Sequence, residues 1–250
     1  HNPMTTTFSA HQYDMCYPPG IEHHWWTLAR NRQLEKLLRQ EFGDTDTLLE
    51  VGCGKGVVVK SLREAGFNIY GVELADVQPV EGAQAWVDSA TDACDWAGAR
   101  RSEVTGLLLL DVIEHLPSPE QFLQRLENSF PKLTAVVITV PTCQELWSNY
   151  DIFTGHHRRY TMDSLEELAA NLNWTIKIAG YFLRISYLPM RLMAALGVDR
   201  NTRINAPSKA MRPLHRLVAL LCQLEQAIIP RRIRGSSAYA VCYLRKPEQQ

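Results

Sequence analysis

Short apolar runs alternate with amphipathic stretches along most of the chain, and this alternation is typical of an α/β fold with a parallel sheet. The runs predict strands over residues 48–51, 67–73, 85–87, 104–110, 133–140, 174–185 and 238–244. Helical periodicity predicts helices over residues 21–42, 57–65, 119–130, about 161–172 (capped by Thr161 or Asp163), 187–196 and 214–228. Residues 5–19 are polar and end in Pro18, Pro19 and Gly20, so we expect an irregular lead-in there.

Three glycines directly follow the first predicted strand. Gly52, Gly54 and Gly56 are spaced by two, and a helical pattern starts at Val57. Glycine allows a positive φ and a close approach of backbone to ligand. A strand, a glycine turn and a helix form the opening unit of nucleotide-binding α/β sheets. The dinucleotide fingerprint would place its third glycine at position 57, so Val57 disfavours a nicotinamide cofactor.

The glycine turn and a second block resemble the S-adenosylmethionine-dependent methyltransferases of the Rossmann-like, class I superfamily. The turn carries their Glu-x-Gly-x-Gly-x-Gly pattern, and residues 111–116 read D-x-x-E-H-L, as in small-molecule members. The resemblance implies that the cofactor is S-adenosylmethionine. It also implies cofactor contacts from Glu50, Gly52, Cys53, Gly54, Gly56, Asp111, Val112 and Ile113. We expect a structural role for Glu114 and His115, which would fix the loop before the next helix.

Two further acidic positions follow predicted strands. Glu73, with Leu74 beside it, stands about 20 residues past the first glycine, where a carboxylate binds the ribose hydroxyls of a nucleotide. The alternative is a surface glutamate at a strand end. The resemblance implies that the loop at Asp88 and Ser89 contacts the adenine, with Asp92 as a substitute if the strand is longer.

Residues 146–160 are too polar and aromatic for a core and follow a predicted strand. They resemble the W-S-x-x-D and G-H-x-R-R-Y segments of a bacterial methyltransferase subgroup. We name His156, Arg159 and Tyr160 as candidate catalytic residues: a neutral imidazole accepts a proton near neutral pH, and Arg158 and Arg159 suit an anionic group. The alternative is a solvated basic loop in which Asp151 pairs with an arginine.

The resemblance covers residues 34–185 and the closing strand. It implies a seven-stranded, mostly parallel sheet with an antiparallel last strand, helices on both faces and an N-terminal cap helix. We divide the chain into a tail and cap helix (1–44), a cofactor-binding core (45–185), a helical insertion (186–236) and a closing strand with its tail (237–250). Adjacent Trp25 and Trp26 point about 100° apart on a helix, so both are not expected in the core. Either one tryptophan packs on the sheet and the other anchors the surface, or the helix caps the cofactor cleft.

The insertion carries an apolar face with arginines around it. Leu214, Leu217, Val218, Leu221, Leu224 and Ile228 share one side of its second helix. Three interpretations remain: helices packed on the flank or in a dimer, a lid over an apolar substrate, or a peripheral contact with anionic lipid. No apolar run approaches the ~18 residues of a membrane span.

Composition and missing motifs limit the classes of partner that the sequence predicts. The formal net charge of −1 and the lack of an Asn/Asp-Pro-Pro-aromatic motif argue against nucleic acid. The six scattered cysteines indicate reduced thiols, a cytoplasmic location and no metal site. We therefore expect a methyltransferase acting on a small molecule with an anionic group and an apolar body, with O-, N- and C-methylation open. The alternatives are an NAD-dependent oxidoreductase and a non-catalytic S-adenosylmethionine-binding module.

Overall fold

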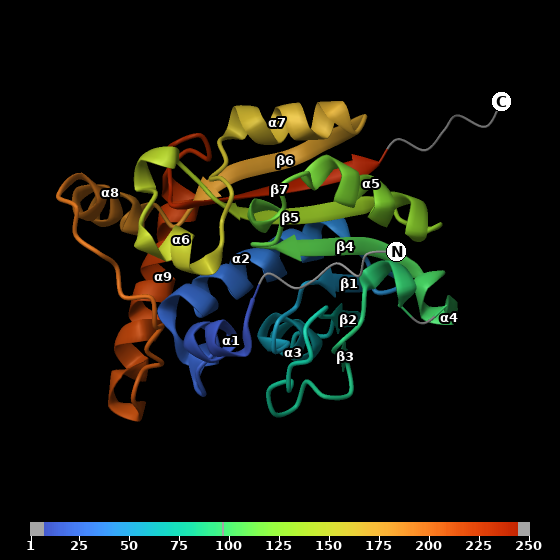
Figure 1. Cartoon of the computed structure of the whole chain (residues 1–250), viewed down its shortest axis with the longest axis horizontal. Helices are drawn as coiled ribbons and strands as arrows, with labels where there is room; N and C mark the ends of the chain where they lie inside the picture. The colour runs from blue at the N-terminus through green and yellow to red at the C-terminus, as the bar shows by residue number, and fades with distance from the viewer. Residues whose placement is uncertain (1–7, 97, 245–250) are drawn as a thin grey trace.

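The computed structural model describes residues 8–96 and 98–244, and these residues form a sheet of seven strands flanked by helices (Figure 1). The tail residues 1–7 and 245–250, which belong to the predicted first and last units, lie outside the described part. The sheet order is β3-β2-β1-β4-β5-β7-β6. The strands are β1 (Thr47–Val51), β2 (Ile69–Val72), β3 (Val87–Asp88), β4 (Val104–Leu110), β5 (Ala135–Pro141), β6 (Trp174–Phe182) and β7 (Ser237–Leu244).

Strand β7 runs antiparallel to both of its neighbours, whereas the other pairings among these seven strands are parallel. It lies between β5 and β6, with Val137 opposite Val241 on one side and Phe182 opposite Ser237 on the other. The order reverses at β1 and β4, which are adjacent and parallel. Ligands of open α/β sheets bind at the carboxyl ends beside such a switch point. The predicted sheet with its antiparallel last strand is confirmed.

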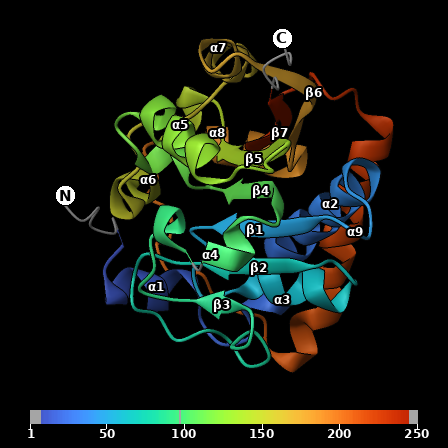
Figure 2. The same cartoon turned by 90° about the vertical axis from the view of Figure 1, so that its right-hand side faces the viewer.

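Helices cover both faces of the sheet, as Figure 2 shows edge-on. They are α1 (Ala10–Cys16), α2 (Trp25–Glu41), α3 (Val57–Glu64), α4 (Gly98–Arg101), α5 (Pro119–Ser129), α6 (Asn149–Thr154), α7 (Met162–Asn171), α8 (Tyr187–Ala195) and α9 (Arg212–Ile228). Side chains alternate along β1, so Leu48 belongs to the core cluster that α2 and α3 cover, whereas Leu49 belongs to the cluster on the opposite face, which includes α5 and α7. The core therefore has two layers, one on each face.

The N-terminal part differs from the sequence expectation. Residues 10–16 form α1 rather than an irregular lead-in, because Ser9 and Gln12 make a reciprocal capping box. The predicted helix over residues 21–42 is divided: a 3₁₀ turn covers Ile21–His23 and α2 starts at Trp25. The break falls at His24, whose extended backbone begins α2 and whose ring accepts a hydrogen bond from the Trp26 N–H.

Strand β6 ends at Phe182, three residues earlier than the pattern predicts. Leu183 has φ +56°, which turns the chain out of the sheet, and a 3₁₀ turn covers Arg184–Ser186. The buried carboxylate of Glu225 on α9 accepts hydrogen bonds from the N–H groups of Arg184 and Ile185 at 2.6 and 2.7 Å. These bonds attach the insertion to the end of the strand.

None of the helices in the described part of the chain is both long and apolar enough to cross a membrane. All six cysteines are free thiols.

Candidate functional site

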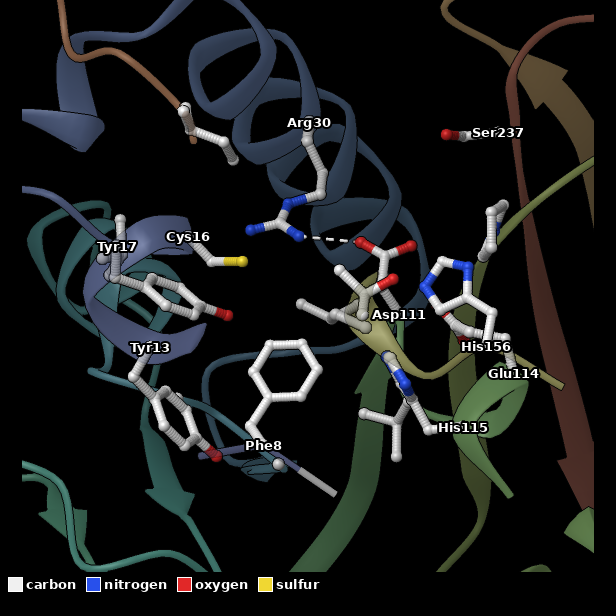
Figure 3. Close-up of a pocket in the computed structure, with 18 of the residues that line it drawn as sticks. Phe8, Tyr13, Cys16, Tyr17, Arg30, Asp111, Glu114, His115, His156 and Ser237 are labelled. Atoms are coloured by element: carbon white, nitrogen blue, oxygen red, sulfur yellow. Dashed lines mark hydrogen bonds and ion pairs between the residues drawn. The ribbon is translucent and has the colours of Figure 1, made fainter. Parts of the chain in front are cut away.

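A cavity of about 500 Å³ opens at the carboxyl ends of β1, β2 and β4 (Figure 3). Its floor is formed by the turn after β1, the end of β2 and the turn after β4. Its walls come from α1, α2, α6 and the insertion. Of the residues predicted to contact a cofactor, it brings together Gly52, Gly54, Glu73, Leu74, Asp111 and Val112. The predicted catalytic residues His156 and Arg159 line the same cavity.

The glycine turn is fixed to the end of β2 by one carboxylate. Oε2 of Glu73 accepts a hydrogen bond from the N–H of Gly54 at 2.8 Å, and Oε1 accepts one from Ala75 at 3.1 Å. Gly54 has φ +54°, which favours glycine. A Cβ there would stand 2.8 Å from Cζ of Tyr17, the residue directly after α1. The Tyr17 ring therefore lies against the turn. Glu73 therefore faces the cavity with its orientation already set.

The turn after β4 is held by an arginine from the other side of the cavity. Nη1 of Arg30 on α2 donates to Oδ2 of Asp111 at 2.9 Å, as Figure 3 shows. Asp111 has φ +56°, in the left-handed region that few side chains adopt. The Arg30 guanidinium also lies 4.2 Å from the centre of the Trp26 ring. The sequence offered no motif for Arg30, and only the inward side of α2 could have indicated it.

Glu50 lies beneath the turn rather than in the cavity wall. It is buried one residue before the carboxyl end of β1, and burial raises its pKa to about 8, although the positive charge of Arg30 opposes this shift. Glu73 and Asp111 nearby raise the pKa further. A neutral Glu50 limits the negative charge that gathers below the cavity.

The loop after β5 builds a hydrogen-bonded trio around one buried carboxylate. Oδ1 of Asp151 lies 2.8 Å from Nδ1 of His156 and accepts from Nε of Arg159 at 2.8 Å, while Oδ2 accepts from Nη2 of Arg159 at 3.0 Å. Burial raises the Asp151 pKa, but the hydrogen bonds from His156 and Arg159 outweigh it and hold that pKa well below its usual range. An ionised Asp151 makes Nδ1 of His156 the donor, so Nε2 keeps its lone pair.

Glu114 and His115 come close to the same imidazole. Oε1 of Glu114 lies 3.9 Å from Nε2 of His156, and the rings of His115 and His156 meet edge to face at 4.7 Å. Burial raises the pKa of Glu114 well above its usual value. Burial also lowers the pKa of His115 to about 4, so the His115 ring is neutral near pH 7. One ligand atom from each of Glu114, His115 and His156 lies within 4.8 Å of the others, a grouping that the sequence did not predict.

The sequence matches the methyltransferase domain family over residues 25–177. This match spans more than half of the chain and covers the glycine turn, Glu73, Asp111 and the Asp151–His156 loop. The chain belongs to the methyltransferase domain family. Its class I fold and its cofactor, S-adenosylmethionine, are those predicted from the glycine turn and the Asp111 block.

Curated relatives that match part of this chain are also methyltransferases. The ubiquinone biosynthesis O-methyltransferase of Cupriavidus pinatubonensis is 26% identical over 121 residues, which cover 42% of this chain and 48% of the relative. The chain spans about half the length of the curated relatives it matches.

Two solved structures share the fold. The Burkholderia thailandensis 1,6-didemethyltoxoflavin-N1-methyltransferase is 18% identical and superposes with a TM-score of 0.52 over 89% of this chain and 81% of that one. A Haemonchus contortus phosphoethanolamine N-methyltransferase 2 is 14% identical, with a TM-score of 0.54 over 98% of this chain and 62% of that one.

Several residues predicted for this methyltransferase site lie outside the cavity lining. Ile113 and Tyr160 are in the core, and the Tyr160 hydroxyl donates to the carbonyl of Ile113 at 3.3 Å. Asp88 accepts a 2.6 Å hydrogen bond from the indole of Trp96. The other predicted positions outside the lining are Glu50, Cys53, Gly56 and Ser89, whereas Thr91, Asp92 and Ala93 of the adjacent loop do line it.

The N-terminal segment supplies ten of the lining residues, and the sequence predicted none of them individually. Phe8, Tyr13, Cys16 and Tyr17 line one wall, and Trp25 and Trp26 are both half-buried in another. Both tryptophans therefore line the cavity and also pack against the core, so the two interpretations of this helix remain open. The capping box at Ser9 and Gln12 was the available sequence signal for this wall.

The two adjacent arginines of the loop after β5, Arg158 and Arg159, bind other groups of the protein. Arg158 donates to the carbonyl of Pro117 at 2.8 Å, and Arg159 is buried against Asp151. A different arginine faces the cavity: the guanidinium of Arg200, in the insertion, lies 4.8 Å from the Tyr150 ring centre. It forms no ion pair within the described part of the chain.

Proposed function

We propose that this chain transfers the methyl group of S-adenosylmethionine to a hydroxyl oxygen of a small-molecule acceptor. The observation that carries the proposal is the Asp151–His156 pair, whose free Nε2 belongs to an imidazole in the cavity wall. A hydroxyl arrives protonated and gains from a base, whereas most amine acceptors attack with a free lone pair. The name of the curated relatives, an O-methyltransferase, supports the same chemistry.

The residues of the chain would divide the work as follows. Glu73 and the glycine turn hold the nucleoside, and Arg30 places a positive charge near Asp111, where it suits the carboxylate of the methionine part. His156 accepts the proton of the acceptor hydroxyl as the oxygen attacks the methyl carbon. The carbon–sulfur bond breaks, and its electron pair stays on sulfur. Asp151 stabilises the imidazolium, and Arg159 positions Asp151.

Replacement of the base tests this assignment. His156→Ala is expected to lower kcat by about 10²- to 10⁴-fold, while the affinity for S-adenosylhomocysteine stays within about twofold. The assay follows transfer of a labelled methyl group to a panel of phenols with and without a carboxylate. An unchanged kcat, or methylation of nitrogen or carbon alone, would overturn the hydroxyl acceptor and the base.

Arg200 supports an anionic group on the acceptor. Burial lowers the pKa of Arg200, and the charge of Arg159 lowers it further, while Tyr150 and Asp151 offset part of this effect. No carboxylate within 4.0 Å pairs with Arg200 in the described part of the chain. An anion bound at this side of the cavity would supply that partner. Arg200→Met is expected to raise KM about tenfold or more for carboxylate-bearing phenols and to leave KM for neutral phenols unchanged. The exposed neighbour Arg203→Met is the matched control, and equal effects of both variants would contradict the assignment.

A further inference from the structure

Helix α9 turns its large apolar side chains away from the protein. It packs against α2 and the end of β6 through a narrow side of small or polar residues, namely Ala219, Cys222 and Glu225. Ile228 is 78% exposed, and about half of the area of each leucine is exposed. The outward side of the helix comprises Leu214, Leu217, Leu220, Leu221, Leu224 and Ile228. The predicted apolar face therefore exists, and it points to solvent.

Helix α8 also exposes large apolar side chains. Leu188 is 70% exposed, and Leu192 and Leu196 are exposed on the helix and just after it. Figure 1 shows α8 and α9 along one edge of the molecule, the edge toward which β4 points. We name the exposed leucines and isoleucine of α8 and α9 the apolar face. Exposed apolar clusters of this kind mark interaction sites on soluble domains.

The segment that carries the apolar face is also rich in exposed basic side chains. Residues 186–236 contain nine Lys or Arg against two acidic residues, Asp199 and the buried Glu225, a net charge of +7. The formal net charge of the whole chain is −1, so the remainder carries −8. The exposed cations of the segment are Arg191, Arg203, Lys209, Arg216, Arg231, Arg232 and Arg234. The charge is thus divided sharply between the insertion and the rest of the protein.

We propose that the apolar face and the basic side chains of its segment bind the surface of an anionic lipid bilayer. Leucines entering the acyl boundary beside arginines at the headgroups are the arrangement of interfacial helices. A second copy of the chain is a poorer fit. The 3–4 spacing from Leu214 to Ile228 covers only about two heptads, and a two-fold contact would bring two segments of charge +7 together.

The apolar face adjoins the proposed acceptor cavity. Met190 on α8 and Arg200 and Ile204 after it line the cavity, and Nδ1 of His215 on α9 accepts a hydrogen bond from the N–H of Trp25 at 3.0 Å. Docking through this segment would place the cavity next to the lipid. The membrane contact itself does not depend on the identity of the acceptor or on turnover.

Flotation with vesicles tests the proposal without an activity assay. Full-length protein is mixed with vesicles of phosphatidylcholine containing 30% phosphatidylglycerol, or with pure phosphatidylcholine vesicles. We expect the partition coefficient on the anionic vesicles to be at least tenfold higher, and to fall as NaCl rises from 0.05 to 0.5 M. Equal binding to both vesicles, or no binding to either, overturns the proposal.

Matched variants separate the apolar and basic contributions. Leu217→Gln/Leu221→Gln is expected to lower the anionic partition coefficient at least tenfold, whereas Leu217→Met/Leu221→Met retains it. Arg216→Ala/Arg232→Ala is expected to lower it about tenfold or more. Arg100→Ala/Lys132→Ala removes two charges at the amino ends of β4 and β5, away from the insertion, and should leave it unchanged. Thermal unfolding confirms that each variant remains folded.

Sedimentation of the protein without lipid distinguishes a second copy. A monomer over the micromolar range agrees with the proposal. A dimer that dissociates in Leu217→Gln/Leu221→Gln, with no vesicle binding by the parent chain, would assign the apolar face to self-association and overturn the membrane contact.

Discussion

Nη1 of Arg30 lies 2.9 Å from Oδ2 of Asp111, so an ion pair joins the first long helix to the end of β4 across the cavity. The two residues are 81 positions apart, and Asp111 holds a left-handed backbone conformation at that contact. The pair therefore joins helix α2 to the floor of the cavity. A change at Arg30 is expected to reach the cofactor site proposed above.

Arg30→Gln should weaken S-adenosylhomocysteine binding about 10- to 100-fold. The substitution removes the charged partner of Asp111 and the positive charge beside the proposed methionine site, each worth about 1–3 kcal/mol. Titration calorimetry measures the Kd. Arg32→Gln, an exposed position on the same helix, is the control and should leave the Kd unchanged. Similar losses in both variants would show that α2 itself, rather than this side chain, is responsible.

Asp151→Asn should destabilise the protein by about 3–5 kcal/mol, because the buried Arg159 loses its carboxylate partner. It should also lower kcat, because an amide does not stabilise the imidazolium of His156. Chemical denaturation and the methyl-transfer assay measure the two effects. Asp163→Asn, in the exposed first turn of α7, should change stability by less than about 1 kcal/mol. A stable Asp151→Asn variant would mean that Arg159 finds other partners.

Gly54→Ala should lower both stability and cofactor affinity. The new Cβ would adopt φ +54° and stand 2.8 Å from the Tyr17 ring, which closes over the turn. Gly66→Ala is a matched control: its φ is +96°, but a Cβ there meets nothing within 4 Å. Both should lose about 1 kcal/mol from the backbone, and only Gly54→Ala should weaken S-adenosylhomocysteine binding, by tenfold or more. Unchanged binding would place the cofactor away from Gly54.

Glu50→Gln should flatten the pH dependence of stability. Burial raises the Glu50 pKa from 4.5 to about 8 in the folded protein, so between these values the folded state keeps a proton that the unfolded chain releases. Stability from this group is present below about pH 4.5 and is lost as pH rises through 8, with a slope of up to about 1.4 kcal/mol per pH unit. Denaturation between pH 5 and 8 without cofactor compares Glu50→Gln with the exposed Glu64→Gln. Identical slopes would contradict a neutral Glu50.

The sheet and the cofactor turn could be predicted because their physical causes are local in sequence. Residues 104–110 and 133–140 are apolar runs that only a buried strand satisfies, and the glycines after β1 adopt positive φ values. The loop around His156 was marked by aromatic and charged residues that a core would not accept. Its internal pairing, with Asp151 between His156 and Arg159, matches one part of the alternative, in which the aspartate holds an arginine. The other part, a solvated loop, is wrong for Asp151 and Arg159, because both are buried.

The remaining features depend on long-range packing. Periodicity identified the apolar face of α9 but not its direction, which is set by Ala219 and Cys222 allowing close approach to α2. Helix α1 has few apolar residues, and Tyr13 and Cys16 are buried only once the cavity wall exists. Arg30 and Arg200 come from segments without a motif, so only the fold brings them to the cavity.

The antiparallel pairing of β6 with β7 has an evolutionary consequence. Phe182 and Ser237 are register partners, so a short reverse turn would suffice to join the two strands, and the roughly fifty residues between them alter no strand pairing. A segment at this junction can therefore be exchanged, lengthened or lost without disturbing the parallel strands β1 to β5, whose carboxyl ends carry the cavity floor.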